Sequence, residues 1–407
     1  MKIATMRHID RWFGVAICLL LTGLRKIGSL ASVSKFTAPQ NPRSILIVKL
    51  AEQGATVLAH KAISKAVEMV GRENVYFLVF KENRFVLDVM NVLPERNIFT
   101  ISTENFGSLA ISAIRVLEKI RKLRIDAAVD FEFFARGSAI LTFLSGAKTR
   151  VGLHGFAGEG PYRGDLMTHR ISYNPHIHTS QMFESMICAI NSLPKELPAL
   201  NFDTPAVQSF TPAFVPSDAE LQEVKNIIQS HTRTAEYRPL VLLNANASDL
   251  LPLRRWPADR YATLAKLLIE KSPKVNIAFT GTTAEKDTVD KLVASIGSQR
   301  CFSLAGKTTF RQLLVLYCLS DLLVTNDSGP AHFASLTPIK VIVLFGPETP
   351  ALFGSNSPNT SAIKKDIPCS PCVNAYNNRF SACKNNVCMQ RISAEEIFQL
   401  ACRLCNL

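Results

Sequence analysis

Apolar residues along this chain are grouped in short blocks separated by longer stretches with helical spacing. The blocks are rich in Val, Ile, Leu and Phe on both faces, which is typical of buried parallel strands. In the first half they predict strands at 44–50, 75–80, 97–101 and 126–131, with helices near 55–70, 82–92 and 107–123. Strands and helices that alternate in this way favour a doubly wound α/β sheet.

The same rhythm returns in the second half. It predicts strands at 239–245, 275–281, 301–306, 321–326 and 340–346, with helices near 257–271, 284–297, 309–319 and 329–336. Between the halves, residues 154–216 are rich in Gly, His, Tyr and Pro, which indicates a long loop, one helix near 178–191 and a linker. We therefore expect two doubly wound domains, 44–205 and 206–407, facing each other across a cleft that would hold the ligands.

Residues 1–43 do not follow this rhythm. An apolar stretch from Trp12 to Leu24 is flanked by basic residues, and a polar segment with two prolines follows at 32–43. The stretch is shorter than the about 20 apolar residues that a bilayer span requires. The pattern favours a membrane-associating segment that lies among lipid headgroups. A helix packed on the protein's own surface and a signal peptide are the alternatives, although Arg25 and Lys26 disfavour cleavage directly after the run.

The charge balance points to anionic partners. The 407 residues include 46 Lys and Arg against 33 Asp and Glu, a formal net charge of +13. These bases are scattered and no basic run is interleaved with aromatic residues, so the sequence does not indicate nucleic-acid binding. The ten cysteines lack the dense spacing of a small secreted scaffold, which favours a reducing compartment.

The strand expected at 321–326 is followed by a polar turn, Asp327-Ser328-Gly329-Pro330, and by His332. Asp and Ser are common helix N-caps, and Pro suits the first helical turn. A helix that begins at a strand end directs backbone N–H groups outward and can bind an anion. The alternative is a capped helix without a ligand, but capping alone does not account for the full run of polar residues.

Several of these segments resemble glycosyltransferase family 9, the ADP-heptose–lipopolysaccharide heptosyltransferases. Residues 304–347 are similar to the signature region of the family, and shorter similarities lie at 45–63, 254–268 and 279–287. The resemblance covers roughly 45–400. It implies a GT-B fold of two Rossmann-like domains, with the acceptor on the first and the nucleotide sugar on the second. It also implies inverting chemistry that requires no metal cofactor for catalysis.

The resemblance assigns donor-binding roles to residues of the second half. Those expected to contact the nucleotide sugar are Arg254, Arg255, Thr280, Gly281, Glu285, Asp327, Ser328, Gly329 and His332. Either arginine would add positive charge to the leaving diphosphate, and Glu285 would accept from ribose hydroxyls. The alternatives are a solvated basic pair before a helix, and a Glu285 that only compensates a helix dipole.

The turn after the first strand departs from the family pattern. The family carries an acid directly after the glycine of this turn, which is taken as the base for the acceptor hydroxyl, whereas here Ala55 follows Gly54. An alanine cannot move a proton, so we expect Glu52, on the same turn, to be the catalytic base. Gly54 would allow close approach of a sugar, and His60 is a poorer candidate for the base. The alternative is that Glu52 is a solvated loop acid.

Acceptor-side residues are expected in the loop and helix of 150–178. The resemblance places Arg150, His154 and His178 where an anionic saccharide or lipid-linked acceptor would lie, together with Arg163 and His176. For any one of them, a solvated loop position is the alternative.

Four cysteines near the C-terminus have a spacing that metal sites use. Cys369, Cys372, Cys383 and Cys388 form a C-x2-C-x10-C-x4-C pattern, which fits a closed structural zinc site. A family feature without metal is the alternative.

Together these features predict an enzyme, an inverting glycosyltransferase that is cytoplasmic and peripheral on the inner membrane. It would move a sugar, expected to be heptose, from a nucleotide-diphosphate donor such as ADP-heptose to a lipopolysaccharide-core or related surface-glycan acceptor. Two alternatives stay open: a sugar-nucleotide-binding protein without activity, motivated by Ala55, and a transferase that uses another nucleotide sugar.

Overall fold

The chain divides into two compact units. The computed structural model describes residues 3–31, 41–158, 160–194, 203–207, 214–232, 236–247, 251–377 and 379–407. The first unit comprises Met1–Val207 and Asn374–Arg379, and the second comprises Gln208–Val373 and Phe380–Leu407. The sequence placed the boundary at 205/206 and did not predict that 374–379 belongs to the first unit. Most of the linker expected at 32–43 lies outside the described residues.

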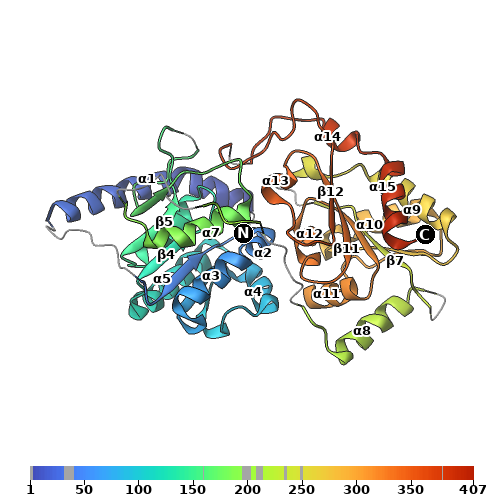
Figure 1. Ribbon diagram of the computed structural model, residues 1–407, viewed down its shortest axis with the longest axis horizontal. Helices are drawn as coiled ribbons and strands as arrows, with labels where there is room; N and C mark the ends of the chain where they lie inside the picture. The colour runs from blue at the N-terminus through green and yellow to red at the C-terminus, as the bar shows by residue number, and fades with distance from the viewer. Residues whose placement is uncertain are drawn as a thin grey trace. The chain divides into compact units, whose positions relative to one another are not determined.

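The first unit contains a six-stranded parallel sheet in the order β3-β2-β1-β4-β5-β6 (Figure 1). Its strands are β1 (Ile45–Val48), β2 (Val75–Phe80), β3 (Ile98–Ile101), β4 (Ala127–Asp130), β5 (Thr149–Leu153) and β6 (His169–Ile171). Ile45 pairs with Val75 on one side and with Ala127 on the other, so β1 lies between β2 and β4. Every residue of β1 and β4 is buried, as their apolar runs predict.

Helices cover this sheet and complete its core. They are α1 (Ile3–Ala31), α2 (Gln53–Leu58), α3 (His60–Val70), α4 (Arg84–Met90), α5 (Phe106–Leu123), α6 (Arg136–Leu144) and α7 (Thr179–Cys188). Leu46 and Val48 of β1 pack with Val116 and Ile120 of α5. The helix predicted at 55–70 is therefore two helices, α2 and α3, that meet at Ala59.

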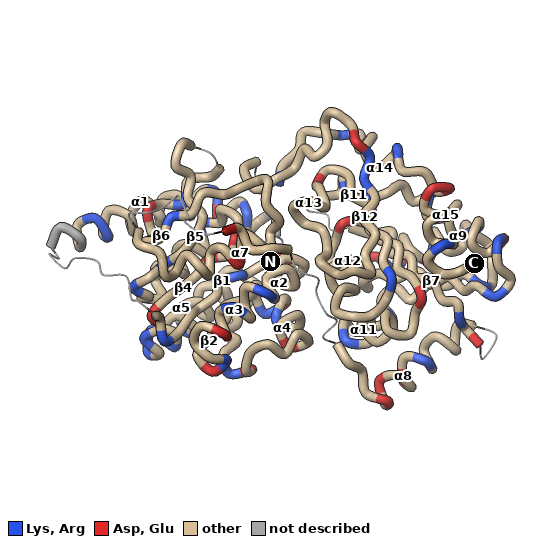
Figure 2. Tube along the Cα trace, in the orientation of Figure 1, with Lys and Arg blue, Asp and Glu red and all other residues tan. Residues whose placement is uncertain are grey.

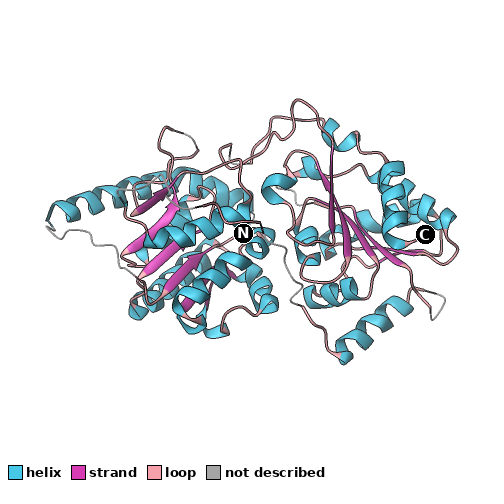
Figure 3. Ribbon diagram, viewed as in Figure 1, coloured by secondary structure: helices cyan, strands magenta, loops and turns pink. Residues whose placement is uncertain are grey.

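The second unit repeats the architecture with a six-stranded parallel sheet in the order β12-β11-β10-β7-β8-β9 (Figure 3). Its strands are β7 (Leu240–Asn244), β8 (Asn276–Phe279), β9 (Cys301–Ser303), β10 (Leu322–Asn326), β11 (Lys340–Phe345) and β12 (Thr360–Lys364). Its helices are α8 (Asp218–Gln229), α9 (Ala258–Lys271), α10 (Lys286–Ile296), α11 (Phe310–Cys318), α12 (Gly329–Ala334), α13 (Pro350–Phe353), α14 (Val387–Gln390) and α15 (Ala394–Cys405). Trp256 and Tyr261 are fully enclosed in its core, with ring centroids 4.8 Å apart.

Each sheet reverses its strand order at its centre. In the first unit the order turns between β1 and β4, and in the second between β7 and β10. Both have the order 3-2-1-4-5-6 of the Rossmann fold, in which ligands bind beyond the carboxyl ends of the strands at the reversal. The doubly wound α/β class predicted from the sequence is confirmed, and the fold directs attention to the residues that follow β1, β4, β7 and β10.

The sequence pattern missed three edge or near-edge strands. Residues 169–171 fall in the segment expected to be loop but form β6, while β5 and β12 were not predicted. β6 has only three residues, and no residue of β12 is fully buried. An edge strand with one exposed side lacks the two-faced apolar run on which the prediction depended.

The N-terminal segment forms the long helix α1, which packs on its own unit along one side. Gly14, Cys18 and Thr22 recur at every fourth position and face the protein, with Cys18 in a small core beside Ala139 of α6. Asp10 accepts hydrogen bonds from the backbone N–H groups of Arg136 (3.2 Å) and Gly137 (2.7 Å) at the start of α6. Among the described residues, no helix combines the length and apolar character that a membrane crossing needs.

Candidate functional site

A buried lysine organises the strand ends of the first unit. Lys49 directly follows β1, and its side chain has no exposed surface. Its Nζ lies 2.9 Å from Oε2 of Glu132, which follows β4, and 3.3 Å from Oε2 of Glu52. The backbone N–H of Ala51 donates to Oε1 of Glu132 at 2.8 Å. One ammonium thus joins the carboxylates that follow the two central strands.

Burial changes the pKa values of the carboxyl groups around Lys49. It raises the pKa of the Glu132 carboxyl, and the nearby Glu52 carboxylate raises it further, while Lys49 opposes both. Burial likewise raises the pKa of Asp130 at the end of β4, although its carboxylate pairs with Arg163. Arg163, which the sequence placed among acceptor-side bases, is therefore engaged inside the unit.

Glu52 has an unusual backbone conformation. Its φ of 65° and ψ of 76° lie in the left-handed region, which costs a non-glycine residue roughly 1 kcal/mol. Glu52 is the N-cap position of α2, and Gly54 and the buried Ala55 lie inside that helix. In this turn it is therefore Glu52, and not Gly54, that adopts the conformation favoured by glycine. Strained residues of this kind concentrate at functional sites.

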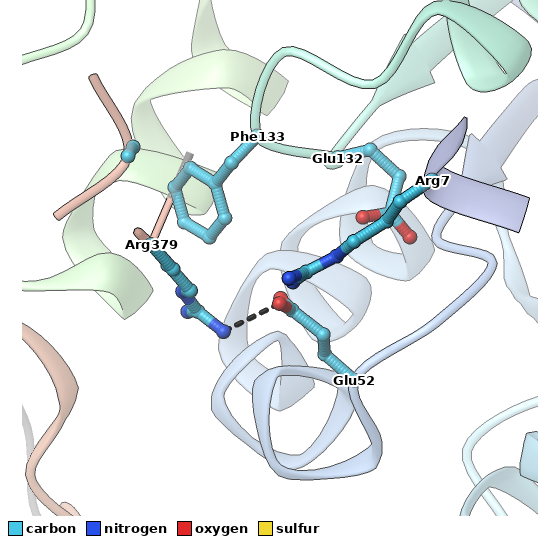
Figure 4. Close-up of a pocket in the computed structure, with 6 residues that line it drawn as sticks. Arg7, Glu52, Glu132, Phe133 and Arg379 are labelled. Carbon is cyan, nitrogen blue, oxygen red and sulfur yellow. Dashed lines mark hydrogen bonds and ion pairs between the residues drawn. The ribbon is translucent and has the colours of Figure 1, made fainter. Parts of the chain in front are cut away.

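A second cation reaches Glu52 from a distant part of the sequence. Arg379 forms an ion pair with Oε1 of Glu52 and lies over the ring of Phe133, 5.8 Å from its centroid. Arg7, Glu52, Glu132, Phe133, Ala375 and Arg379 line a small cavity of about 40 Å³. Figure 4 shows Arg7 and Arg379 directed toward the Glu52 carboxylate. The sequence predicted Glu52 but not Lys49, Glu132, Arg7 or Arg379.

The side-chain amide of Asn326 connects the ends of the two central strands of the second unit. Asn326, the last residue of β10, has no exposed surface and donates to the carbonyls of Ala245 (3.2 Å) and Asn246 (3.1 Å) beyond β7. Its Oδ1 accepts from the backbone N–H of Trp256 (3.0 Å) and the hydroxyl of Tyr261 (3.2 Å). The four hydrogen bonds fix the segment that carries Arg254 and Arg255 at the carboxyl ends of β7 and β10.

The structure separates the two arginines predicted to contact the donor. Arg254 is 2.5 Å from the buried Glu348, and it donates to the backbone carbonyl of Asp327 at 3.2 Å. Its Nε is 3.8 Å from the Asp327 carboxylate. Arg255 instead donates to the carbonyl of Ala247, at 2.8 Å from Nη2. Arg254 is therefore the one that lies beside the start of α12.

The polar turn before α12 is largely enclosed. Asp327, Ser328 and His332 are buried, and the Ser328 hydroxyl donates to the carbonyl of Asn326 at 3.2 Å. A Cβ at Gly329 would lie 3.0 Å from the Phe333 ring, so a side chain at this position would crowd the ring within α12. The helix has only six residues, shorter than the sequence predicted.

The residues expected near the nucleoside make local contacts. Thr280 is buried, and its Oγ1 accepts from the Asn244 amide at 3.1 Å. A Cβ at Gly281 would lie 3.0 Å from the Asn246 amide. Glu285 accepts from the backbone N–H (2.7 Å) and hydroxyl (2.9 Å) of Thr282, which is a capping box. Its contact with ribose remains a prediction.

The expected acceptor-side residues do not gather in one place. Arg150 donates to the carbonyls of Leu166 (2.8 Å) and Ala147 (2.6 Å), and burial lowers its pKa to about 10. His178 caps α7 by accepting from the backbone N–H of Ser180 at 3.2 Å. The His154 ring packs edge-on against Phe156. None of the three lines the cavity at Glu52.

The four C-terminal cysteines do not form a metal-binding group in this structure. None of the ten cysteines, all of which lie in the described part of the chain, forms a disulfide, and Cys369 and Cys383 are exposed. Cys372 lies 3.4 Å from the Ser381 hydroxyl, and Cys383 donates to the carbonyl of Asn385. In the described part of the chain, no cluster of three His, Cys, Asp or Glu side chains could hold a metal ion. A structural zinc site stays a prediction from the cysteine spacing.

The fold and both strand-end clusters define a protein built from two Rossmann-like units. Its structure is similar to that of E. coli ADP-heptose LPS heptosyltransferase II, with a TM-score of 0.64 and 18% identity over 89% of this chain and 98% of the other. It is also similar to a glycosyl transferase family 9 structure from Veillonella parvula, with a TM-score of 0.68 and 16% identity over 91% and 99%. These similarities establish the fold.

The family itself follows from the sequence match. The model of "Glycosyltransferase family 9 (heptosyltransferase)" matches residues 114–381, more than half of the chain. The chain therefore belongs to glycosyltransferase family 9. The matched range contains the donor-side residues and Arg379 but begins after Glu52.

Curated relatives match over shorter segments. Lipopolysaccharide heptosyltransferase 2 of Salmonella typhimurium is 31% identical over 31% of this chain and 36% of its own length. Lipooligosaccharide heptosyltransferase 2 of Campylobacter jejuni is 28% identical over 36% and 45%. The matched region thus spans less than half the length of either relative.

We predict that Lys49→Met will destabilise the first unit, because it leaves the buried Glu132 carboxylate without its ammonium partner. Loss of one member of a buried ion pair costs about 3–5 kcal/mol. Urea unfolding followed by circular dichroism measures the change. The control is Lys81→Met, since the Lys81–Glu104 pair is exposed and its loss should change stability by under about 1 kcal/mol. Equal effects of the two substitutions would contradict this account.

Proposed function

We propose that this protein is an inverting glycosyltransferase that uses Glu52 as its catalytic base. The observation that carries the proposal is the position of Glu52. Its carboxylate is held by Lys49 at the strand-order reversal of the first unit, with the backbone in a left-handed conformation. Membership of glycosyltransferase family 9 supports the reaction class.

The reaction would be a single displacement. The hydroxyl oxygen of the acceptor attacks the anomeric carbon of the donor sugar, and Glu52 takes the hydroxyl proton as the new bond forms. The bond from the anomeric carbon to the diphosphate breaks on the opposite side, and the nucleoside diphosphate leaves. Ala55 occupies the position where the family carries its acid, so the proton must go to another group.

The donor we propose is ADP-heptose, bound at the carboxyl ends of β7 and β10. Similar structures include an E. coli heptosyltransferase solved with ADP, with a TM-score of 0.59. Asp327, Ser328, Gly329 and His332 would surround the diphosphate. Arg254, already balanced by Asp327 and Glu348, would position the start of α12 beside it. The acceptor would be a lipopolysaccharide core or a related surface glycan, as the names of the relatives suggest.

We predict that ADP will raise the melting temperature of the protein more than UDP, GDP or CDP does. A ligand at about 100 times its dissociation constant adds about 2.7 kcal/mol to stability, which a thermal scan resolves easily. A melting-temperature shift with another nucleotide would agree with a transferase but would show that its donor is not ADP-heptose. If no nucleotide changes the melting temperature, the donor site proposed at Asp327–His332 is wrong.

We predict that Glu52→Gln will lower turnover of ADP-heptose with truncated lipopolysaccharide by at least about 100-fold, because the amide cannot accept the proton. The ADP-induced melting shift should not change, since Glu52 lies in the other unit. Glu68→Gln on α3 provides the control, because this acid is exposed. Wild-type turnover by Glu52→Gln would refute the base assignment. ADP binding without turnover by the wild-type protein would favour the non-catalytic alternative.

We further propose that α1 docks on an anionic membrane surface. The side of the helix opposite Cys18 is apolar and exposed; it carries Trp12, Phe13, Ile17, Leu20, Leu24 and Ile27. Exposed Arg11 and Lys26 flank this face, and Figure 2 marks the basic residues of the helix. Apolar residues bordered by bases suit the headgroup region of anionic lipids. The location we propose is cytoplasmic, with the inner membrane as the docking surface.

We predict that the protein will sediment with phosphatidylglycerol vesicles and that Leu20→Glu will weaken this binding at least about tenfold. Leu20 is 63% exposed, and burying a leucine in lipid contributes about 1.5–3 kcal/mol. Leu123→Glu is the matched control, because Leu123 is an exposed leucine of α5 in the same unit. Equal binding by wild type and Leu20→Glu would show that this face of α1 does not dock on the membrane. Equal binding of the wild type to uncharged vesicles would also contradict the proposal, because the surface would not need to be anionic.

A further inference from the structure

Arg379 is the last residue of a short segment of the first unit that lies far along the chain from the rest of that unit. Residues Asn374–Arg379 are part of the first unit, whereas Val373 and Phe380 are not. The Tyr376 hydroxyl donates to the carbonyl of Tyr173 at 2.5 Å, and the two rings meet edge-on with centroids 5.0 Å apart. Tyr376 therefore fixes its part of this segment independently of the charge of Arg379.

The Arg379 guanidinium has two fixed neighbours. It pairs with the Glu52 carboxylate and lies over the Phe133 ring, with its side chain mostly enclosed. An arginine held over an aromatic face keeps its charge and its orientation. The guanidinium thus meets Glu52 in a defined direction, as Figure 4 shows.

Charged groups from four segments face Glu52. Lys49 follows β1, Glu132 follows β4, Arg7 belongs to α1, and Arg379 comes from the Asn374–Arg379 segment. Glu132 is paired with Lys49, so its repulsion of Glu52 is partly balanced. Arg379 pairs with Oε1 of Glu52, whereas Lys49 lies nearest Oε2.

We propose that Arg379 is a positioning residue for Glu52, which keeps the carboxylate ionised and directed into the cavity. The inference rests on the proposed function, in which Glu52 is the base. Lys49 lies nearest one carboxylate oxygen and Arg379 nearest the other, and Arg7 is also directed toward this carboxylate, so Arg379 is one of three cations that favour its ionised form, and its contact with Oε1 sets the direction of the side chain. The donor-side and acceptor-side assignments do not include Arg379.

The direction of the expected effect follows from electrostatics. A cation beside a carboxylate favours the ionised form, typically by one or more pH units. Its removal lets Glu52 hold a proton to higher pH. The acid limb of the kcat/KM profile should therefore move up by about one pH unit in Arg379→Met, with about tenfold lower activity below the limb. On the alkaline plateau the carboxylate is ionised in both proteins, so most of the activity should return.

The experiment uses the full chain with two readouts. The first is the pH profile of kcat/KM with ADP-heptose and truncated lipopolysaccharide. The second is the titration midpoint of the Glu52 carboxyl, measured by NMR on protein with 13C-labelled glutamate and assigned by the signal missing in Glu52→Gln. Arg379→Lys keeps the charge and should restore both values to near wild type. Arg96→Met removes an exposed ion pair with Glu73 and is the control for loss of any arginine.

The outcomes separate the inference from the proposed function. An upward shift of both readouts in Arg379→Met alone supports the inference. An unchanged midpoint overturns it, even if Glu52→Gln is inactive. Wild-type turnover by Glu52→Gln would show that Glu52 is not the base. The NMR titration midpoint of Glu52 would then test on its own whether Arg379 keeps this carboxylate ionised. If Arg379→Met does not fold, Arg379→Gln also removes the charge and should give the same shift.

Discussion

The reversal of strand order at the centre of each sheet determines where chemistry can occur in this protein. On either side of the reversal, the chain leaves the sheet in opposite directions, so the carboxyl ends of the two central strands are not covered by a crossover. In the first unit these are β1 and β4, and in the second β7 and β10. No crossover helix covers the polar residues after these strands, so their hydrogen bonds and ion pairs are made with one another and with nearby loops.

Different polar contacts join the central strand ends in the two units. The first uses charge: a fully buried ammonium on Lys49 joins the carboxylates of Glu52 and Glu132. The second uses a neutral amide: Asn326 connects the ends of β7 and β10 to the segment before α9. A charged cluster suits proton transfer, and a rigid amide network, with Arg254 paired to Asp327 and Glu348 beside it, suits binding of a charged ligand. This division is the basis on which we propose the base on the first unit and the nucleotide sugar on the second.

The sequence predicted the central strands and singled out Glu52, the acid in the turn after β1, because both depend on local pattern. β1 and β10 are continuous apolar runs, and Glu52 lies in the turn directly after one of them. Contacts between distant segments have no such signal: Arg379 is 327 positions from Glu52, and Glu132 is 83 from Lys49. Residue type also did not reveal the capping contacts of His178 and Glu285, and their expected contacts with ligands stay predictions.

The central claim is that the donor lies at the carboxyl ends of β7 and β10, while the base belongs to the first unit. A crystal structure of the full chain with ADP tests this most directly. The account predicts electron density for the diphosphate beside Asp327–His332, with Glu52 still paired to Lys49. Density for ADP in the cavity lined by Arg7, Glu52 and Arg379 would contradict it, because that cavity would then be the nucleotide site.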